Sequence, residues 1–336
     1  MSTQFDLVYH CDSRPEIGNG HLKRGLDVLH SIHRRQPGLN LGICGDYSDS
    51  AKRFITDFLD PTIAVFHSPT ELPTSTVAVL DSMHRPGDPS YLDADITGRI
   101  GKSGQRFVIV SSSLRISLPV QCDLFLDHVP DVQIQGQQPR EKRVGFQYAP
   151  VSAEFFETVT DSSFDRPGHL VAVIGGGPIQ DGPERLAAAF YDRALEEFGR
   201  FSIVLSPHFP VEHKAKLEQR FPRLEFLQGI PSIAPLLQSA KAIICTYGNI
   251  AYESLSCGKP TFLANYVDFQ DEYAVYLEQK GLVVNLGLFD HLDNSKSEQV
   301  FNTDRRTKLS AQAKELFPRS GIEAITDELL KLLKAG

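Results

Sequence analysis

The sequence predicts an α/β fold with parallel sheets, arranged as two domains. Short apolar runs recur along the chain and alternate with stretches of helical period, as in parallel sheets covered by helices. At 336 residues, the chain exceeds the usual size of a single core. A Ser-, Thr-, Asp- and Pro-containing stretch separates its halves. We therefore expect an N-terminal domain over 1–154, a linker over 155–167 and a C-terminal domain over 168–336.

The first half should begin with a strand, a glycine-containing loop and a helix. The apolar run 5–10 is the strand, and the helix covers 21–36, where leucines recur at helical spacing before Pro37-Gly38. Further apolar runs predict strands at 39–44, 62–66, 77–81, 107–111 and 123–127.

The second half repeats this pattern. Apolar runs predict strands at 169–174, 201–205, 224–227, 242–246 and 260–264, with helices between them. Near the end of the chain, Ile322, Ile325, Leu329 and Leu333 form a helical stripe. We expect this last helix to pack on one of the two domains.

Composition excludes several classes of protein. With 41% hydrophobic and 23% charged residues, the chain is neither disordered nor membrane-spanning, and no apolar run is long enough for membrane insertion. The N-terminus lacks the basic and apolar regions of a signal peptide, so we expect a cytoplasmic protein. A net charge of −8 argues against nucleic acid as a partner. The 5 cysteines include no CxxC pair and should be reduced and mostly buried.

The most informative motif follows the first predicted strand and opens the first predicted helix. Gly18 and Gly20 allow a close approach of the backbone to a ligand, and the helix N-terminus offers free N–H groups to an anion. His21 lies in the first helical turn, where the helix dipole disfavours a charged imidazole and would leave it able to act as a base. The alternative is a connecting loop with an incidental surface histidine.

A second strand, turn and helix occurs at 242–257. Tyr247, Gly248 and Asn249 form the turn, which suits a pyrophosphate at the helix N-terminus. Glu253 lies one turn further on, where its carboxylate could accept hydrogen bonds from both hydroxyls of a ribose. The alternative is an ordinary strand-helix unit in which Glu253 is a solvated residue.

Two weaker candidates also follow strands. Gly176 belongs to a Gly-Gly-Gly loop that could face a ligand or form a structural turn; Gln180 replaces the last glycine of a dinucleotide fingerprint. Asp81 and His84 follow the strand at 77–81 and could project into a ligand site. No Asp-x-Asp pair stands at a strand end among these loops, so we expect no metal and no other cofactor. Zincin, P-loop and α/β-hydrolase motifs are also missing from the sequence.

Several segments occur in the order typical of one family. They are Ile17-Gly-Asn-Gly-His21-Leu-Lys-Arg24, Gln147 to Phe155, Gly175-Gly176, Gly248 with Glu253-Ser-Leu-Ser-Cys-Gly-Lys-Pro260, and Gln270 with Ala274, Leu277 and Gly281. In these residues the chain resembles the nucleotide-sugar hydrolases of the pseudaminic-acid pathway, which remove UDP from a diacetamido trideoxyhexose. The resemblance covers nearly the whole chain and extends more loosely to the GT-B glycosyltransferase that forms lipid II.

The resemblance implies a GT-B fold, in which two Rossmann-like domains with parallel sheets face a central cleft. It also implies that the second domain holds UDP and that the reaction at the anomeric carbon needs no metal. His21 matches the essential histidine of the family, and Asp81 aligns with an aspartate of the same site. Arg24, His84 and Gln270 would lie on the sugar side.

Three departures from the family concern the site. The tyrosine expected shortly after Asp81 is replaced by Ser82-Met83-His84, and Phe269 stands where an asparagine precedes the glutamine. The small-residue run before the glutamate reads Tyr247 to Ile250. The nucleotide side is thus closer to the family pattern than the sugar side, and the identity of the sugar stays open.

These observations predict an enzyme of surface-glycan or nonulosonate biosynthesis that hydrolyses a UDP-sugar with inversion and releases UDP. His21 would deprotonate a water while the Gly248 turn stabilises the leaving UDP. The alternative is a GT-B glycosyltransferase, in which a sugar or glycan acceptor replaces the water. A binding protein without catalysis is the third possibility. Because His21 and Gly248 belong to different predicted domains, we expect these to close on the substrate around 155–167.

Overall fold

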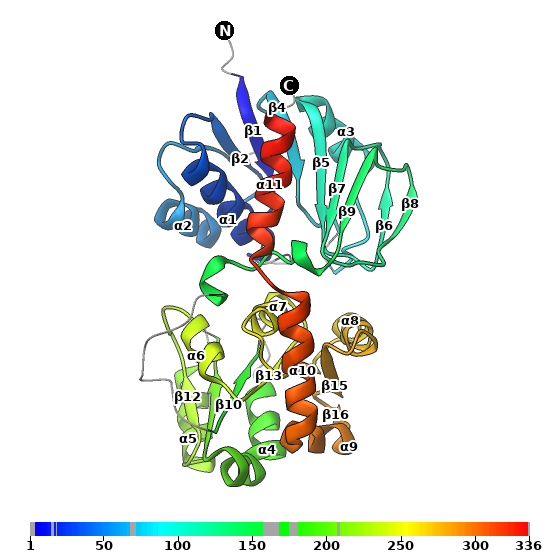
Figure 1. The fold of residues 1–336 in the computed structure, drawn as a ribbon. Helices are drawn as coiled ribbons and strands as arrows, with labels where there is room; N and C mark the ends of the chain where they lie inside the picture. Colours follow the sequence, from blue (N-terminus) through cyan, green and yellow to red (C-terminus); the bar gives the residue numbers. More distant parts are fainter. Residues whose placement is uncertain are drawn as a thin grey trace. The chain divides into compact units, whose positions relative to one another are not determined.

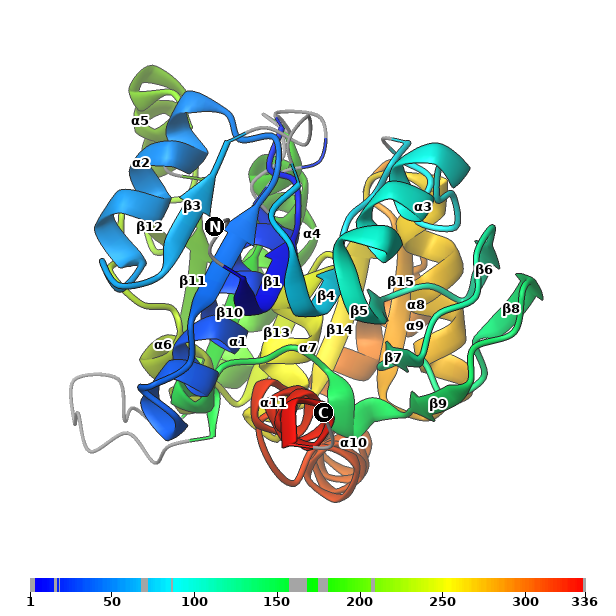
Figure 2. The same ribbon diagram turned by 90° about the horizontal axis from the view of Figure 1, so that it is seen from above.

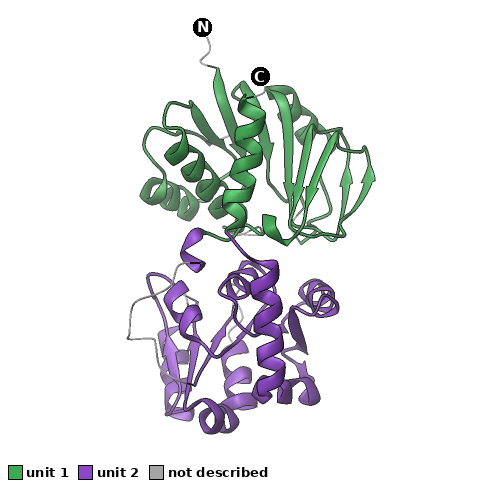
Figure 3. Ribbon diagram, in the orientation of Figure 1, with its two compact units in different colours: residues 1–152, 320–336 green, residues 153–319 purple. Residues whose placement is uncertain are grey.

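The chain folds into two compact units in a computed structural model, which describes residues 4–14, 17, 19–67, 72–85, 87–156, 168–174, 181–206 and 209–334. Unit 1 comprises residues 1–152 and 320–336, and unit 2 comprises residues 153–319 (Figure 3). The boundary differs from the sequence-based one, which places 320–336 in the C-terminal domain. The reason is that the apolar stripe of the last helix is buried in the core of unit 1.

Unit 1 is built on a parallel sheet of seven strands (Figure 1). The strands are β1 (Phe5–His10), β2 (Leu41–Cys44), β3 (Ala64–Phe66), β4 (Ser75–Leu80), β5 (Gly104–Ser111), β7 (Leu124–Asp127) and β9 (Glu141–Val144), in the order β3-β2-β1-β4-β5-β7-β9. The central strands are buried apolar runs, as parallel strands covered on both faces require. Next to β9 lies a small parallel pair, β6 (Arg115–Leu118) and β8 (Gln133–Gly136), visible at the side of Figure 2.

Two helices far apart in sequence lie side by side on this sheet. Besides α2 (Asp49–Phe58) and α3 (Ala94–Ser103), unit 1 contains α1 (Gly20–Arg35) and the last helix, α11 (Gly321–Lys334) (Figure 1). Leu26 and Leu29 of α1 share one apolar core with Ile325 of α11. At the rim, Arg34 Nη2 donates to Glu323 Oε1 at 2.8 Å. The last helix is therefore part of the first unit, although its sequence follows the second.

Unit 2 repeats the architecture. Its sheet contains β10 (His169–Val173), β11 (Arg200–Val204), β12 (Glu225–Leu227), β13 (Ala242–Cys245), β14 (Thr261–Asn265), β15 (Val283–Leu288) and β16 (His291–Leu292), in the order β12-β11-β10-β13-β14-β15-β16. All neighbours pair in parallel except β15 and β16. The helices are α4 (Gly182–Phe198), α5 (Val211–Arg220), α6 (Ala234–Ser239), α7 (Asn249–Ser256), α8 (Asp268–Gln279), α9 (Asn294–Ser297) and α10 (Thr303–Leu316). Short 3-10 helices lie at Ala153–Phe155 and Glu298–Phe301 in unit 2, and at Phe146–Tyr148 in unit 1.

The two units confirm the predicted α/β class with parallel sheets, and in each the carboxyl ends of the central strands lead into the candidate ligand loops. All 5 cysteines are free, and four of them are buried. No helix within the described parts of the chain is both long and apolar enough to cross a membrane.

Candidate functional site

A histidine and an aspartate meet at the carboxyl edge of the first sheet. His21 lies in the first turn of α1, and Asp81 directly follows β4. Since β1 and β4 are neighbouring parallel strands, the loop after β1 and the end of β4 emerge at the same edge. His21 Nδ1 lies 2.7 Å from Asp81 Oδ1. A carboxylate can only accept, so Nδ1 carries a proton, and in the neutral imidazole the lone pair is then on Nε2.

Three donors besides His21 hold the Asp81 carboxylate. Arg24, one turn further along α1, donates to both Asp81 oxygens through Nε and Nη2. The Tyr9 hydroxyl of β1 donates to Asp81 Oδ2 at 2.6 Å. Arg24 Nη1 in turn donates to Ser112 Oγ at 2.7 Å. The guanidinium of Arg24 thus forms hydrogen bonds with Asp81, and its predicted contact with a sugar stays a prediction.

The charges of this cluster follow from burial and from the pairing. Burial alone would raise the pKa of Asp81, but the neighbouring Arg24 and His21 hold the pKa of that carboxyl below its usual range. Burial opposes the charge of Arg24, and Asp81 outweighs it, so the pKa of the guanidinium is raised. Burial and Asp81 together raise the pKa of Tyr9, which keeps its phenol protonated. At neutral pH the cluster therefore holds an ionised Asp81 that fixes the His21 tautomer.

A cavity of about 240 Å³ lies within unit 1, lined by residues at and just after the ends of β1, β2 and β4 and by residues of α3. Its lining includes His10, Asp12, Ser82 and His84. His84 Nδ1 accepts the backbone N–H of Asp93 at 2.6 Å, so the His84 proton lies on Nε2. The Nε2 atoms of His84 and His10 are both buried and have no hydrogen-bond partner within the described residues. The structure thus places the predicted sugar-side residue His84 in the lining of this cavity, two residues after Ser82, the neighbour of Asp81.

The imidazoles of this cavity are uncharged at neutral pH. Burial lowers the pKa of His10 to about 3. Burial also lowers the pKa of His84, although Asp12 and Asp93 act in the opposite direction. Neutral imidazoles with open Nε2 positions match hydroxyl groups better than phosphates, because they offer hydrogen bonds without positive charge. His84 binding a sugar remains a prediction.

The Gly248 turn lies at the carboxyl edge of the second sheet. β13 ends at Cys245, and α7 begins at Asn249, with Gly248 as its N-cap. Gly248 has φ 146° and ψ −164°, a conformation that glycine adopts readily and other residues rarely. Within the described residues no side chain caps α7. Its first-turn N–H groups are therefore placed to meet an anion.

Side chains from the neighbouring strand and helix fix this turn. The backbone N–H of Tyr247 donates to Asn265 Oδ1 at 2.9 Å, and its carbonyl accepts from Gln270 Nε2 at 3.0 Å. The Tyr247 ring stacks on Tyr273 of α8 at a centroid distance of 4.7 Å. Gln270 Oε1 also accepts the Tyr266 backbone N–H at 3.4 Å. Gln270 therefore positions the turn in this structure, and its predicted sugar contact remains untested.

The other predicted residues are placed as follows. Glu253 lies half-buried on α7, one turn after the exposed Asn249. Gly20 is the exposed first residue of α1. Gly18, Gly176 and most of the predicted linker, residues 157–167, lie outside the described part of the chain. No group of three His, Cys, Asp or Glu side chains suited to a metal ion occurs in the described residues.

Sequence reasoning missed three residues that complete these sites: Tyr9, His10 and Asn265. Tyr9 lies within a predicted strand, where an aromatic residue gives no separate signal, whereas Asn265 directly follows the strand predicted at 260–264. His10 is the last residue of β1 and could have been found, because side chains at strand ends often reach ligand sites.

Comparison with known proteins identifies the fold. No family model matches the sequence, and the search of curated proteins found no match. Acinetobacter baumannii MurG matches 97% of this chain over 99% of its own, with 15% identity and a TM-score of 0.67. The calicheamicin glycosyltransferase CalG4 matches 99% of each chain with 13% identity and a TM-score of 0.59. Anabaena HepE, solved with UDP and glucose, matches 99% of this chain over 100% of its own with 12% identity and a TM-score of 0.58.

At these identities the likeness shows the fold alone, and that fold is GT-B, with two Rossmann-like units. The predicted fold class is confirmed. None of the three similar structures points to the pseudaminic-acid hydrolases in particular.

Proposed function

We propose that this chain is a metal-independent, inverting glycosyltransferase that takes its sugar from a UDP-sugar. The observation that carries the proposal is the His21–Asp81 pair, because it orients the imidazole at the carboxyl edge of a Rossmann-like sheet with Nδ1 toward Asp81, so that Nε2 is the nitrogen that would act as the base. The names of similar structures support the same chemistry, since CalG4 is a glycosyltransferase and HepE was solved with UDP and glucose. This is the alternative that the sequence left open.

The proposed reaction is one displacement at the anomeric carbon. His21 Nε2 removes the proton from an acceptor hydroxyl, whose oxygen forms a bond to the anomeric carbon as the bond from that carbon to the UDP oxygen breaks. Asp81 keeps the imidazole in the required tautomer and stabilises the imidazolium that forms. Arg24 and Tyr9 act as positioning residues, because they hold Asp81 through its other hydrogen bonds.

The leaving UDP would be held by residues of unit 2. The first-turn N–H groups of α7 would donate hydrogen bonds to the diphosphate. The hydrogen bonds that Asn265 and Gln270 make to Tyr247 hold the turn before α7 in place, so these N–H groups need no rearrangement. Glu253 would accept hydrogen bonds from the two ribose hydroxyls. In unit 1, the cavity lined by His10 and His84 would bind hydroxyl groups of the acceptor or of the transferred sugar.

Hydrolysis of the UDP-sugar remains a second candidate function, because two segments of the sequence resemble UDP-sugar hydrolases. The segments from Ile17 to Arg24 and from Glu253 to Pro260 resemble the pattern of the UDP-sugar hydrolases. The same base and leaving-group site would serve both reactions, since a water can replace the acceptor hydroxyl.

The test is release of UDP from a panel of UDP-sugars, with and without sugar or glycan acceptors. We expect release that depends on an acceptor and persists in EDTA, and we expect His21→Ala to abolish it. His30→Ala, on the same helix but outside the site, serves as the matched control. Release without an acceptor would identify a hydrolase, and UDP binding without turnover would identify a binding protein. Loss of activity in EDTA with recovery in magnesium would refute the metal-independent mechanism.

A further inference from the structure

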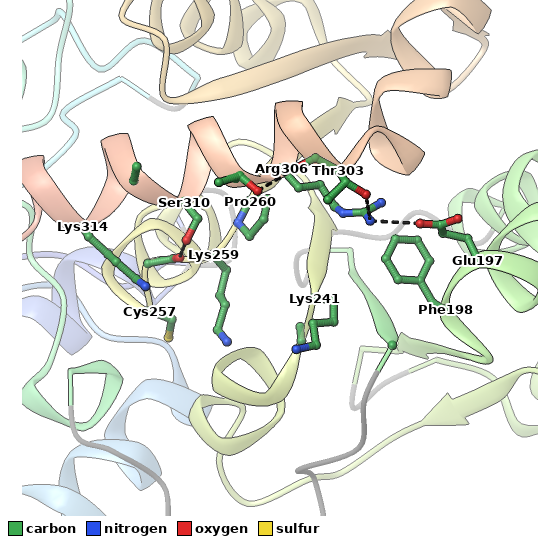
Figure 4. Close-up of a pocket in the computed structure, with 15 residues that line it drawn as sticks. Glu197, Phe198, Lys241, Cys257, Lys259, Pro260, Thr303, Arg306, Ser310 and Lys314 are labelled. Carbon is green, nitrogen blue, oxygen red and sulfur yellow. Dashed lines mark hydrogen bonds and ion pairs between the residues drawn. The ribbon is translucent and has the colours of Figure 1, made fainter.

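The cavity of about 240 Å³ in unit 1 and a larger concave surface of about 700 Å³ in unit 2 lie at different ends of their sheets. Lys241 and Pro260 line the larger surface and immediately precede β13 and β14, so it lies at the amino ends of these parallel strands (Figure 4). Open parallel sheets bind ligands at the carboxyl ends of their strands, where the unit 1 cavity lies. The cavity in unit 1 is therefore the better placed of the two to bind a ligand.

The side chains that line this cavity lie on the α3 face of the unit 1 sheet. His10 of β1 pairs in register with Cys44 of β2 and with Leu80 of β4, and all three line the cavity. Side chains at one register of neighbouring strands lie on the same face of a sheet. Ile96 and Ile100 of α3 complete the lining on this face. Figure 2 shows α3 and α11 on opposite sides of the sheet.

The candidate base lies on the other face of the same sheet. Side chains alternate along a strand, so Tyr9, next to His10, points to the face covered by α1 and α11 and shares a core with both helices. The carboxylate of Asp81 is held from that face, because Tyr9 Oη and His21 Nδ1 lie 2.6 Å and 2.7 Å from its oxygens. The ends of β1 and β4 therefore lie between the cavity and His21.

The cavity has an apolar wall and a polar wall. Ile96 and Ile100 form the first, and the second contains His10, Ser82 and His84. His84 Nε2 carries a proton, because its Nδ1 accepts a backbone N–H at 2.6 Å, and this Nε2 has no acceptor in the part of the chain that the structure describes. The His10 side chain is only 3% exposed, and its Nε2 also has no partner among the described residues. Buried polar atoms without partners are costly, so a ligand that hydrogen-bonds to both imidazoles is favoured.

The charged groups of the lining are largely compensated. Asp12 Oδ2 accepts from Ser82 Oγ at 2.9 Å and lies 3.9 Å from Arg14 Nη2. Asp12 Oδ1 accepts the backbone N–H of Asp46 at 3.1 Å, and the Asp46 residue itself is exposed. The buried side of the cavity thus offers hydrogen bonds without an excess of charge, which suits an uncharged ligand.

We propose that this cavity binds a second, non-reacting sugar unit of the acceptor, which is uncharged and is linked to the unit whose hydroxyl reaches His21. This inference rests on the proposed transferase function. In an inverting displacement the nucleophile and the leaving group lie on opposite faces of the transferred sugar, so groups on the side of the base contact the acceptor. One ring cannot both fill a cavity on the α3 face and present its hydroxyl to His21 on the α1 face.

The size and the walls of the cavity agree with a single sugar unit. Its volume of about 240 Å³ is below the range of about 300–1,000 Å³ for pockets that take drug-sized ligands, so a nucleotide does not fit. The C–H groups of a sugar ring would contact Ile96 and Ile100. Its hydroxyls both donate and accept, as His10, Ser82 and His84 require.

Acceptors that share the reacting unit and differ only in the second unit test the proposal. UDP release is measured with a monosaccharide glycoside, with the corresponding neutral disaccharide, and with a disaccharide whose second unit is a uronic acid. We expect kcat/KM to be about tenfold or more higher for the neutral disaccharide than for either of the others, as two further hydrogen bonds would give. A neutral disaccharide no better than either of the other acceptors would refute the proposal.

Filling the cavity from its exposed rim tests the location of the subsite. Ile96 is 39% exposed, so Ile96→Trp places a larger side chain at the cavity without replacing a residue of the buried core. In this variant kcat/KM for the neutral disaccharide should no longer exceed that for the monosaccharide. Ala94→Trp is the matched control, because Ala94 is also exposed in the first turn of α3 but lies outside the lining, and it should keep the preference. An unchanged preference in Ile96→Trp would place the second unit elsewhere and refute the proposal.

A binding measurement separates failure of this inference from failure of the proposed function. Nitrogen NMR of protein with isotope-labelled histidine reports the Nε2 atoms of His10 and His84 without turnover. The neutral disaccharides should shift both resonances and leave those of His30, on α1 and outside the cavity, unchanged. A chain that transfers sugar but shows no shift at either imidazole would refute the subsite alone. Shifts in a chain that transfers no sugar would refute the transferase and keep the cavity as a sugar site.

Discussion

At the scale of single residues, the best-defined feature is the environment of Asp81. Its carboxylate accepts from His21, Tyr9 and both Nε and Nη2 of Arg24, and its side chain is fully buried. Such an arrangement is stable only while every member is present, since removing one partner leaves a buried charge or donor uncompensated. The stability of unit 1 and the tautomer of His21 therefore depend on the same carboxylate.

Replacement of Asp81 by asparagine tests this dependence. Asp81→Asn removes the negative charge and leaves Arg24 buried without it, so the free energy of unfolding should fall by about 3–5 kcal/mol at pH 7. Because the folded-state pKa of Asp81 is lowered, its contribution is present above the unfolded pKa of about 4 and is lost as the pH falls below it. The variant should therefore differ less from wild type in acid, as measured by urea unfolding.

Ser112→Ala is the control for this variant, because it removes only the outer partner of Arg24 and should cost about 1 kcal/mol. In the transferase assay, Asp81→Asn should also lower kcat by at least about 100-fold through loss of the His21 tautomer. An Asp81→Asn protein as stable and active as Ser112→Ala would contradict both roles.

Asp127, at the end of β7, should make the protein less stable as the pH rises, which is opposite to the effect of Asp81. Burial raises the pKa of Asp127 to about 7, although its carboxyl accepts N–H groups from Val129 at 2.8 Å and Ser113 at 3.2 Å. The folded-state pKa lies above the unfolded-state pKa of about 4, so between these values Asp127 is protonated in the folded state and ionised in the unfolded state. The free energy of unfolding therefore falls as the pH rises from about 4 to 7. Relative to Asp127→Asn, the wild type should lose up to about 4 kcal/mol over that range.

Urea unfolding of wild type and Asp127→Asn at pH 4.5 and pH 8 measures this difference. The asparagine cannot titrate, so whatever it costs in lost hydrogen bonds stays constant with pH. A stability difference that does not change between the two pH values would show that Asp127 is ionised in the folded state throughout.

Glu253 carries the prediction for nucleotide binding. If its carboxylate accepts hydrogen bonds from both ribose hydroxyls, Glu253→Gln should weaken UDP binding by about 1.5–3 kcal/mol in calorimetry without altering the fold. Glu272→Gln, on α8 instead of α7, is a control of the same chemistry. Equal UDP affinity in the two variants would leave Glu253 as a structural helix residue.

The sequence singled out the candidate catalytic residues but not the side chains that hold them. His21 and Asp81 could be named because a helix N-terminus and a strand end are recognisable positions. That Arg24 binds Asp81 depends on the pairing of β1 with β4, which brings together residues 57 apart in the chain. Gln270 reaches Tyr247 across 23 residues for the same kind of reason, through the order of strands in unit 2. Short sequence patterns do not predict contacts between residues that are this far apart in the chain.

At the scale of elements, apolar runs predicted the buried central strands, while the polar ones were missed. β1 and α1 lie within one residue of their expected bounds, because both carry clear apolar periodicity. β8 and β9 read QIQG and EKRV and are largely exposed, so no hydrophobic signal marks them. β15 is apolar, yet it was not among the predicted strands. Polar strands such as β8 and β9 are thus the part of this fold that a reading of hydrophobicity leaves out.

The start of α11 is set by a close backbone contact. A Cβ added to Gly321 would lie 1.9 Å from the carbonyl oxygen of Ala149, so the helix must move if any side chain is present. Gly321→Ala should lower the free energy of unfolding by about 1–3 kcal/mol or more, the usual range for overpacking. Gly98→Ala in α3 is the matched control, since its nearest neighbour, Val120 Cγ1, is 3.9 Å away. That control should stabilise by about 0.5–1 kcal/mol in the same thermal or urea unfolding measurement.

At the scale of the whole molecule, the chain order and the unit boundaries disagree. The chain forms most of unit 1, then all of unit 2, and returns to unit 1 with residues 320–336. The sequence could show that a terminal amphipathic helix exists, but not which core it joins, since an apolar stripe fits either. Hydrogen bonds between side chains of α1 and α11 add to the apolar contacts that join the last helix to unit 1. Ser31 Oγ donates to Glu323 Oε1 at 3.0 Å, and Arg35 Nη2 donates to Asp327 Oδ1 at 2.7 Å.

Deleting residues 320–336 should therefore destabilise the unit that begins the chain and spare the unit that precedes the deletion. Ile322, Ile325, Leu329 and Leu330 are buried in the core of unit 1. At about 1.5–3 kcal/mol for each buried side chain, their loss is comparable with the whole stability of a domain, about 5–15 kcal/mol. Hydrogen exchange with mass spectrometry should show β1 and β4 losing protection while β10 and β13 keep theirs. Loss of protection in β10 and β13 to the same extent would mean that unit 2 does not hold its fold independently of the last helix.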